Sequence, residues 1–247
     1  MTNSVAMYFA RIESLLHELQ AAESVAIEQA ASRIAETIAN DGLVHVFGSG
    51  HSNLLAQEVF HRAGGLVPVN AMLDVNLTIF GSARATMVER LEGYAPSLLA
   101  TYEVQHVDTV IVISTSGVNP VPVEVAELAR KQGAFVIGVV SAAAYANAPT
   151  RTSTGKRLAD VVDVVLDTHV PVGDAVQPIG DSGIVVGATS TILGATLLNA
   201  LFVAAASALE ERGLPVPAFV SQNVPGGDEH NHDLIARYQS RIPLMKP

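Results

Sequence analysis

The sequence predicts an α/β fold: a three-layer sandwich around a five-stranded parallel sheet in the order 2-1-3-4-5, with a helical N-terminal extension. From residue 43 onward, short β-branched apolar runs alternate with helical stretches. Continuous apolar runs of this kind suit strands that are buried on both faces of a parallel sheet, with right-handed crossovers between them. Hydrophobic residues make up 49% of the 247 residues and charged residues only 15%, which is enough apolar material for a large core.

The first forty residues have the apolar spacing of helices. Apolar side chains recur at intervals of three and four, with a weak break near Glu23–Ser24, and Asn40-Asp41-Gly42 provides a stop with a glycine for a left-handed cap. The expected strands then follow at 43–47, 66–69, 109–113, 135–140 and 161–166. Helical segments are expected between them, among others at Asn53–Arg62 and Val121–Gln132. We divide the chain into N-terminal helices (1–40), the α/β domain (41–212) and a C-terminal tail with a helix (213–247).

One uncharged segment raises the question of a membrane span. No charged residue occurs in the 28 positions from Ser182 to Leu209, which exceeds the length that a span requires. Glycine, serine and threonine interrupt the segment, and its flanks Asp181 and Glu210 are acidic rather than basic. We therefore expect no membrane span, but a small-residue-rich helix buried in the core or between subunits.

Composition narrows the functional classes. The formal net charge is −10, with 24 acidic and 14 basic residues, which argues against a non-specific nucleic-acid binder. Cysteine is absent, which excludes thiol catalysis, disulfides and thiolate metal sites. The first sixteen residues lack an apolar stretch followed by a small-residue cleavage site, so we expect a cytoplasmic protein. We expect neither a cofactor nor a metal ion.

Two glycine- and serine-rich loops are the main candidates for ligand binding. Gly48–Asn53 (GSGHSN) follows the first expected strand and Ser114–Pro120 (STSGVNP) follows the third. In the expected strand order both loops flank the switch point of the sheet, where helix N-termini and hydroxyl groups can bind a phosphate without lysine or arginine. The alternative is that each loop merely connects a strand to a helix. The expected substrate-binding residues are Gly48, Ser49, Gly50, His51, Ser52, Ser114, Thr115, Ser116, Gly117 and Asn119.

These two loops resemble those of the sugar isomerase (SIS) domain family. The matching motifs are G-x-G-x-S at Gly48–Ser52 and S-x-S-G at Ser114–Gly117, and the resemblance covers residues 30 to 212, most closely a stand-alone group of the family. It implies that Ser52, Ser114 and Ser116 contact a phosphate. The family often has Ser or Thr where this chain has Asn119. Family members include aldose–ketose isomerases, an N-acetylmuramic acid 6-phosphate etherase and sugar-phosphate-sensing regulators.

Four further side chains are candidates for proton transfer. Glu58 and His61 have i, i+3 spacing on the helix expected after the first loop, where they would share one face; the alternative is a solvated pair. Glu229 and His232 lie on a helix expected in the C-terminal tail, which either folds over an active site, its own or a neighbour's, or is a capped surface helix. His51 is expected to contact the ligand, with helix capping as its alternative.

The sequence therefore predicts a phosphosugar-binding protein, with isomerisation of an aldose–ketose or amino-sugar phosphate as the favoured reaction. Two alternatives stay open: lyase chemistry of the etherase type, and a non-catalytic phosphosugar sensor. The expected partners are a sugar phosphate and further copies of the chain. A homodimer or tetramer would form through the N-terminal helices and the uncharged late helix.

Overall fold

The fold is built around one parallel sheet. A computed structural model describes residues 4–146 and 148–246 of the chain. The sheet has five strands in the order β2-β1-β3-β4-β5, and each neighbouring pair is parallel. The strands are β1 (Val44–Gly48), β2 (Val69–Met72), β3 (Thr109–Ile113), β4 (Phe135–Val140) and β5 (Val164–Asp167). The predicted fold class and strand order are confirmed.

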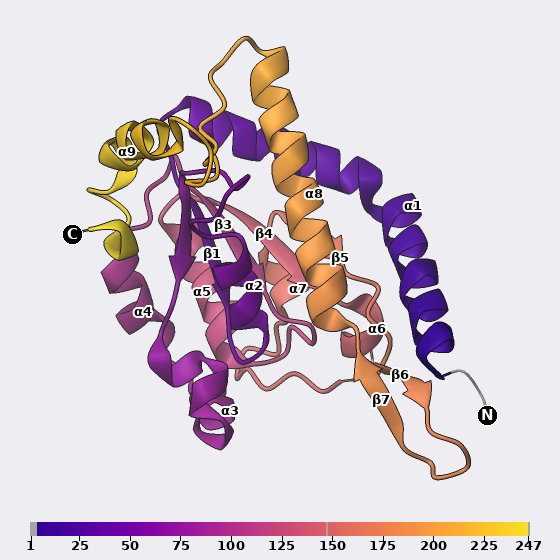
Figure 1. The fold of residues 1–247 in the computed structure, drawn as a ribbon. Coiled ribbons are helices and arrows are strands. Elements are labelled where there is room, and N and C mark those ends of the chain that lie inside the picture. The colour runs from indigo at the N-terminus through magenta and orange to yellow at the C-terminus, as the bar shows by residue number, and fades with distance from the viewer. Residues whose placement is uncertain (1–3, 147, 247) are drawn as a thin grey trace.

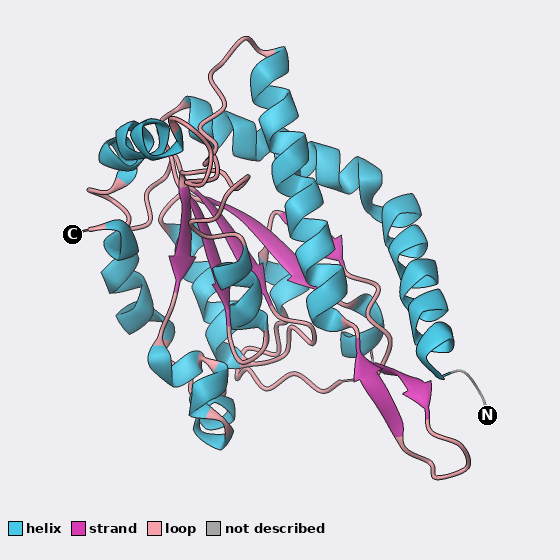
Figure 2. Cartoon of the chain, viewed as in Figure 1, coloured by secondary structure: helices cyan, strands magenta, loops and turns pink. Residues whose placement is uncertain are grey.

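Helices cover both faces of the sheet and complete a three-layer sandwich (Figure 2). Successive strand residues face opposite layers, so that Val46 and Ile111 belong to one core and Phe47 and Val112 to the other. One layer consists of α1 (Ser4–Ala39), α2 (Ser52–Glu58) and α8 (Ser190–Glu211). The other contains α4 (Ala95–Tyr102), α5 (Pro120–Lys131) and α7 (Leu158–Val161).

The N-terminal helices form one continuous helix. α1 spans the predicted break, and Figure 1 shows it bending about halfway along its length. Within the helix the Ser24 hydroxyl donates a hydrogen bond to the carbonyl of Gln20, a contact that bends helices. The sequence signal at Glu23–Ser24 therefore marks a hydrogen bond from a side chain to the backbone within a continuous helix, not the end of a helix.

The uncharged segment forms α8, which packs along α1 (Figure 1). By length and composition alone α8 is suited to a membrane span. In the fold, its inner residues Leu193, Leu197 and Leu201 are fully buried, whereas Val203 on the opposite side is 67% exposed. Within the single chain α8 therefore closes the core with one face only, and burial of its other face between subunits stays a prediction.

Two strands lie further along the chain than predicted. Leu66 and Val67 precede β2 and are buried against residues 217–219 instead, with the Val67 amide donating to the carbonyl of Pro217 at 2.7 Å. Before β5, α7 takes up Leu158–Val161 and the strand starts at Val164. The run at 66–69 is buried as expected, whereas the run at 161–166 is buried only in part: Val161 and Leu166 are buried but Val165 is exposed.

The connections carry short elements. α3 (Ala83–Val88) and the 3₁₀ turns η1 (Val75–Leu77) and η2 (Ile79–Gly81) lie between β2 and α4, and α6 (Ala142–Tyr145) follows β4. A hairpin of β6 (Ala175–Pro178) and β7 (Val185–Ala188) projects from the domain before α8 (Figure 1). The tail forms α9 (Gly227–Tyr238) and η3 (Pro243–Met245), and α9 packs at the end of the sheet where the strands begin.

Candidate functional site

The two predicted loops lie side by side at the carboxyl edge of the sheet. β1 and β3 are neighbours, with Gly48 paired to Ile113, so the residues that follow them emerge together. α2 begins at Ser52 and α5 begins at Pro120, and the strand ends direct both helix N-termini to this edge. An open α/β sheet binds its ligands at such a switch point.

Glycine is required in these loops for two different reasons. A Cβ on Gly48 would lie 2.4 Å from the carbonyl oxygen of Ser52, so the first loop closes too tightly for any side chain there. Gly50 and Gly117 instead have left-handed backbones, with φ of +56° and +60°. The Gly50 amide donates to the carbonyl of Leu77 at 2.7 Å, which attaches the first loop to η1.

A cavity of about 280 Å³ lies between the two loops. His51 and Ser52 come from the first loop and Thr115 from the second. Leu55, Ile113 and Val139 provide its apolar surface, and the polar side chains that sequence reasoning missed are Thr168, Asp174, Ser190 and Thr191. Its size is close to the lower end of the range for small-molecule sites, about 300 Å³.

Several donors in the two loops have no partner within the described part of the chain. There the hydroxyls of Ser52, Thr115 and Ser116 bond to no other group, and no acceptor takes the amides of Thr115 and Ser116. His51 is the N-cap residue of α2, but its side chain forms no capping hydrogen bond, so the capping alternative does not apply. These groups can converge on an anion, as a phosphate requires.

Two other residues that were predicted to bind the substrate form hydrogen bonds within the protein instead. The Ser49 hydroxyl donates to Glu89 Oε2 at 2.7 Å, and the side-chain Nδ2 of Asn119 donates to Glu89 Oε1 at 2.7 Å. The guanidinium of Arg151 donates to Asn119 Oδ1 at 3.0 Å. Ser114 is buried, and its Oγ accepts from the Gly117 amide. Glu89 therefore joins the two loops, and Arg151 brings a positive charge to the second.

No sequence signal pointed to Glu89 or Arg151. Glu89 follows α3 in the long connection between β2 and α4, and Arg151 lies in an irregular segment after α6. The carbonyl of Glu89 accepts from the Val121 amide at 3.1 Å, and the Arg151 amide donates to the carbonyl of Val118 at 2.9 Å. Both residues reach the site through long-range backbone contacts with α5 and its preceding loop.

The predicted proton-transfer pair on α2 does not share a helical face. α2 ends at Glu58, and His61 lies beyond it with φ of +46°. Glu58 forms an ion pair with Arg62, and the His61 ring packs 4.8 Å from the ring of Phe219. The prediction of one shared face is wrong, because the chain leaves the helix four residues earlier than expected and turns toward the tail. Both residues are separated from the two candidate loops by the length of α2.

The C-terminal candidates lie at the opposite end of the sheet from the loops. α9 packs against Leu43 and Val67, which precede β1 and β2, whereas the loops follow the strand ends (Figure 1). Glu229 and His232 are exposed on α9, and His232 contacts Asp233 at 3.7 Å. Within one chain the tail therefore does not cover the loops. Its contribution to a neighbouring subunit's site stays a prediction.

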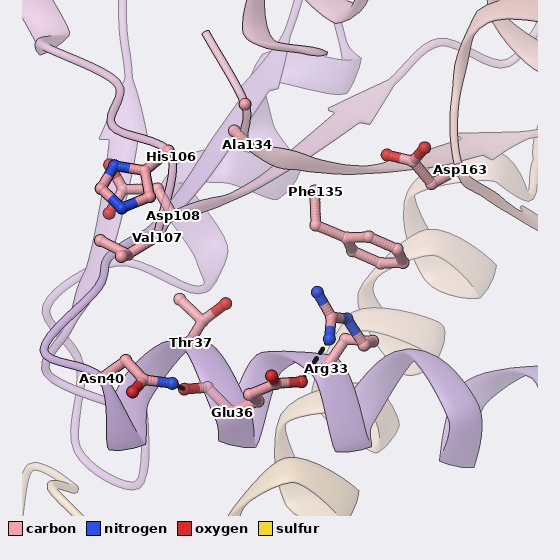
Figure 3. A pocket seen from close by; sticks show the side chains of 11 residues that line it. Arg33, Glu36, Thr37, Asn40, His106, Val107, Asp108, Ala134, Phe135 and Asp163 are labelled. Atoms are coloured by element: carbon pink, nitrogen blue, oxygen red, sulfur yellow. Dashed lines mark hydrogen bonds and ion pairs between the residues drawn. The ribbon is translucent and has the colours of Figure 1, made fainter.

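A second hollow, of about 350 Å³, lies between α1 and the amino-terminal edge of the sheet (Figure 3). Its charged groups are already paired: Arg33 forms an ion pair with Glu36 and stacks 4.9 Å above Phe135, while Asp163 binds Arg130. In residues 4–146 and 148–246 no cluster of three or more His, Asp or Glu could hold a metal ion. The loop cavity is thus the better candidate site.

The fold and the paired loops define an SIS (sugar isomerase) domain, and the family model of that domain matches residues 7–141. The chain is 43% identical to a UPF0309 protein of Halalkalibacterium halodurans, over 98% of this chain and 97% of the relative. It is 40% identical to a UPF0309 protein of Listeria innocua, over 94% of each chain. This chain therefore belongs to the UPF0309 family of SIS-domain proteins.

Solved structures share the fold. A phosphoheptose isomerase from Francisella tularensis superimposes with a TM-score of 0.55 at 18% identity, covering 85% of this chain and 100% of that one. The phosphoheptose isomerase GmhA from Neisseria gonorrhoeae gives a TM-score of 0.53 at 18% identity, over 81% of this chain and 95% of the other. At this identity the likeness concerns the fold alone.

Proposed function

We propose that this chain is a cytoplasmic, phosphosugar-binding protein that isomerises an aldose–ketose or amino-sugar phosphate. The observation that carries the proposal is the cavity between the two loops, lined by His51, Ser52 and Thr115. Unpaired hydroxyl and amide donors meet there at the ends of two adjacent parallel strands. Membership of the SIS family and the fold shared with phosphoheptose isomerases support the same substrate class.

The phosphate is expected at the second loop. It carries about −1.5 to −2 charges near neutral pH and needs several converging donors. The free amides of Thr115 and Ser116 and the hydroxyl of Ser52 supply neutral donors. Arg151, held by Asn119, adds the positive charge that the loops themselves lack. The sugar then extends into the cavity.

Isomerisation also needs a base that moves a proton between neighbouring carbons. Within the chain, the carboxylate of Glu89 is hydrogen-bonded to both loops, through Ser49 and Asn119. We assign the role of base to Glu89, since Glu58 is paired with Arg62 and lies at the end of α2 that is far from the loops. Glu229 and His232 remain candidates for a contribution from a neighbouring subunit.

The test separates enzyme from sensor. Wild type, Glu89→Gln and Glu92→Gln are incubated in D₂O with a panel of hexose, heptose and amino-sugar 6-phosphates, and carbon-bound deuterium is followed by NMR. Glu92 is the matched control, because it lies three residues away but bonds to Ser153 rather than to either loop. Exchange in wild type and Glu92→Gln, with a loss of at least a hundredfold in Glu89→Gln, supports an enzyme with Glu89 as its base, and conversion of aldose to ketose in the same spectra supports an isomerase. Binding without exchange indicates the sensor alternative, and no binding refutes the proposal.

The partner proposed for the exposed face of α8 is a second copy of the chain. A groove of about 520 Å³ runs between α1 and α8, and Ile192, Ala200 and Val203 are exposed on α8. Val203→Glu is expected to shift the mass measured by light scattering from dimer or tetramer toward monomer. Val75→Glu is the matched control, because Val75 is 69% exposed but distant from α8. A monomeric wild type, or an unchanged mass in Val203→Glu, would remove this interface.

A further inference from the structure

The carboxylate of Asp174 occupies the N-terminus of α8 beside the cavity. Asp174 lies at the base of the projecting hairpin, with a left-handed backbone of φ 65°. Its Oδ1 accepts from the amides of Thr189 and Ser190 at 2.8 and 2.7 Å, and from the Thr189 hydroxyl at 3.1 Å. Because the protein's own carboxylate already takes these donors, a ligand phosphate is excluded from this helix end.

The second oxygen of this carboxylate retains acceptor capacity. Oδ2 accepts one hydrogen bond, from the Ser190 hydroxyl at 2.7 Å, and a carboxylate oxygen can accept two. Partial burial acts to raise the pKa of Asp174, but the hydrogen bonds from Ser190 and Thr189 outweigh it and hold the pKa below its ordinary value. Asp174 is therefore ionised at neutral pH.

The charge of Asp174 is not balanced by lysine or arginine at the cavity wall. Among the described residues that line the cavity, the only other titratable side chain is His51, and the remaining polar groups are hydroxyls. Arg151 belongs to the other side of the second loop, where Asn119 holds it. At the second loop the charges of Arg151 and Glu89 offset each other, because both bond to Asn119, whereas Asp174 carries a negative charge at the cavity wall with no lysine or arginine beside it.

We propose that Asp174 determines the specificity of the site: it accepts a hydrogen bond from a hydroxyl or amino group of the bound sugar and rejects phosphosugars that carry a carboxylate. This inference rests on the proposed function, since it presumes that the phosphate lies at the second loop. Under this inference, the substrates are phosphates of neutral sugars or of amino sugars. Like charges in a partly buried site repel strongly enough to change affinity by about tenfold or more.

Two ligands that differ at one carbon test the inference. Glucitol 6-phosphate and 6-phosphogluconate have the same open six-carbon chain, with an alcohol or a carboxylate at C1. Their Kd values are measured by calorimetry for wild type, Asp174→Asn, Thr189→Val and Asp181→Asn. Thr189→Val removes one hydrogen bond to the carboxylate but leaves its charge, and Asp181→Asn makes the same charge change at the exposed tip of the hairpin.

Wild type is expected to bind the alcohol at least tenfold more tightly than the acid. Asp174→Asn should reduce this ratio to about twofold or less, while both control variants keep it. Equal affinities in wild type, or an unchanged ratio in Asp174→Asn, would overturn the inference while leaving the phosphate site intact. Should neither these two ligands nor other sugar phosphates bind to wild type, the proposed function itself fails. Because each variant supplies its own ratio, a general loss of stability does not imitate the result.

Discussion

The buried carboxylate of Asp108 is expected to make folding stability depend on acid pH. Asp108 is 1% exposed and lies just before β3. It accepts hydrogen bonds from the amides of Leu43 and Gln105 at 2.8 and 2.7 Å, and from Arg241 of the tail at 2.7 Å. His45 lies 3.2 Å away on β1. One ionised side chain thus joins two strands to the C-terminal segment.

Two magnitudes follow: the pH dependence of stability comes from the lowered pKa of Asp108, and the cost of Asp108→Asn comes from the broken ion pair. Burial acts to raise the pKa of Asp108, but the hydrogen bonds from His45, Leu43 and Arg241 lower it from 3.8 to about 2. A depressed pKa contributes stability above pH 4 that is lost as the pH falls toward 2, about 2 kcal/mol in all and roughly half of it by pH 3. Asp108→Asn breaks the buried pair with Arg241 and should cost about 3–5 kcal/mol at pH 7.

Urea unfolding followed by circular dichroism, from pH 7 to pH 3, measures both effects. The free-energy difference between wild type and Asp108→Asn should be largest at neutral pH and shrink by about 1 kcal/mol by pH 3. Asp181→Asn, at the exposed hairpin tip, is the control and should stay within about 0.5 kcal/mol of wild type. A difference below about 1 kcal/mol at pH 7, or one that does not change with pH, would refute the reasoning.

Three other variants test the loops. Gly48→Ala places a Cβ 2.4 Å from the Ser52 carbonyl oxygen and should displace the start of α2, so that phosphosugar affinity measured by calorimetry falls at least tenfold. Gly50→Ala meets open space and strains only a positive φ, so it should cost roughly 1–2 kcal/mol of stability in urea unfolding with a smaller loss of affinity; the reverse order would contradict the loop geometry. Arg151→Gln keeps a donor for Asn119 but removes the charge, and should weaken binding about threefold to tenfold while reducing its salt dependence. An unchanged salt dependence would place the phosphate elsewhere.

Local signals in the sequence were enough to predict the sheet. The runs at 109–113 and 135–140 became β3 and β4 with the predicted bounds, because both are central, fully covered strands where apolar pattern and pairing coincide. The run at 66–69 became β2 only in part, because Leu66 and Val67 pair with the distant segment 217–219. A contact between segments so far apart in the chain produces no signal in the local sequence pattern.

The candidate site likewise combines features that local motifs predict with features that depend on long-range contacts. The two loops were predictable, since glycine and hydroxyl residues at strand ends are local motifs. Glu89, Arg151 and Asp174 were not, because each reaches the loops through long-range contacts with α5 or α8. The pattern at Glu58 and His61 suggested a helical pair, but periodicity does not reveal where a helix ends when the next turn is stabilised by packing against Phe219.

The phosphate site itself is tested most directly by titrating a bound hexose or heptose 6-phosphate with ³¹P NMR and calorimetry against wild type, Ser52→Ala plus Ser116→Ala, and the exposed control Ser240→Ala. Each lost hydrogen bond to a charged group is worth about 1.5–3 kcal/mol, so the double variant should bind at least a hundredfold more weakly while the control binds like wild type. Undiminished affinity and an unshifted phosphorus signal in the double variant would contradict phosphate binding between the two loops.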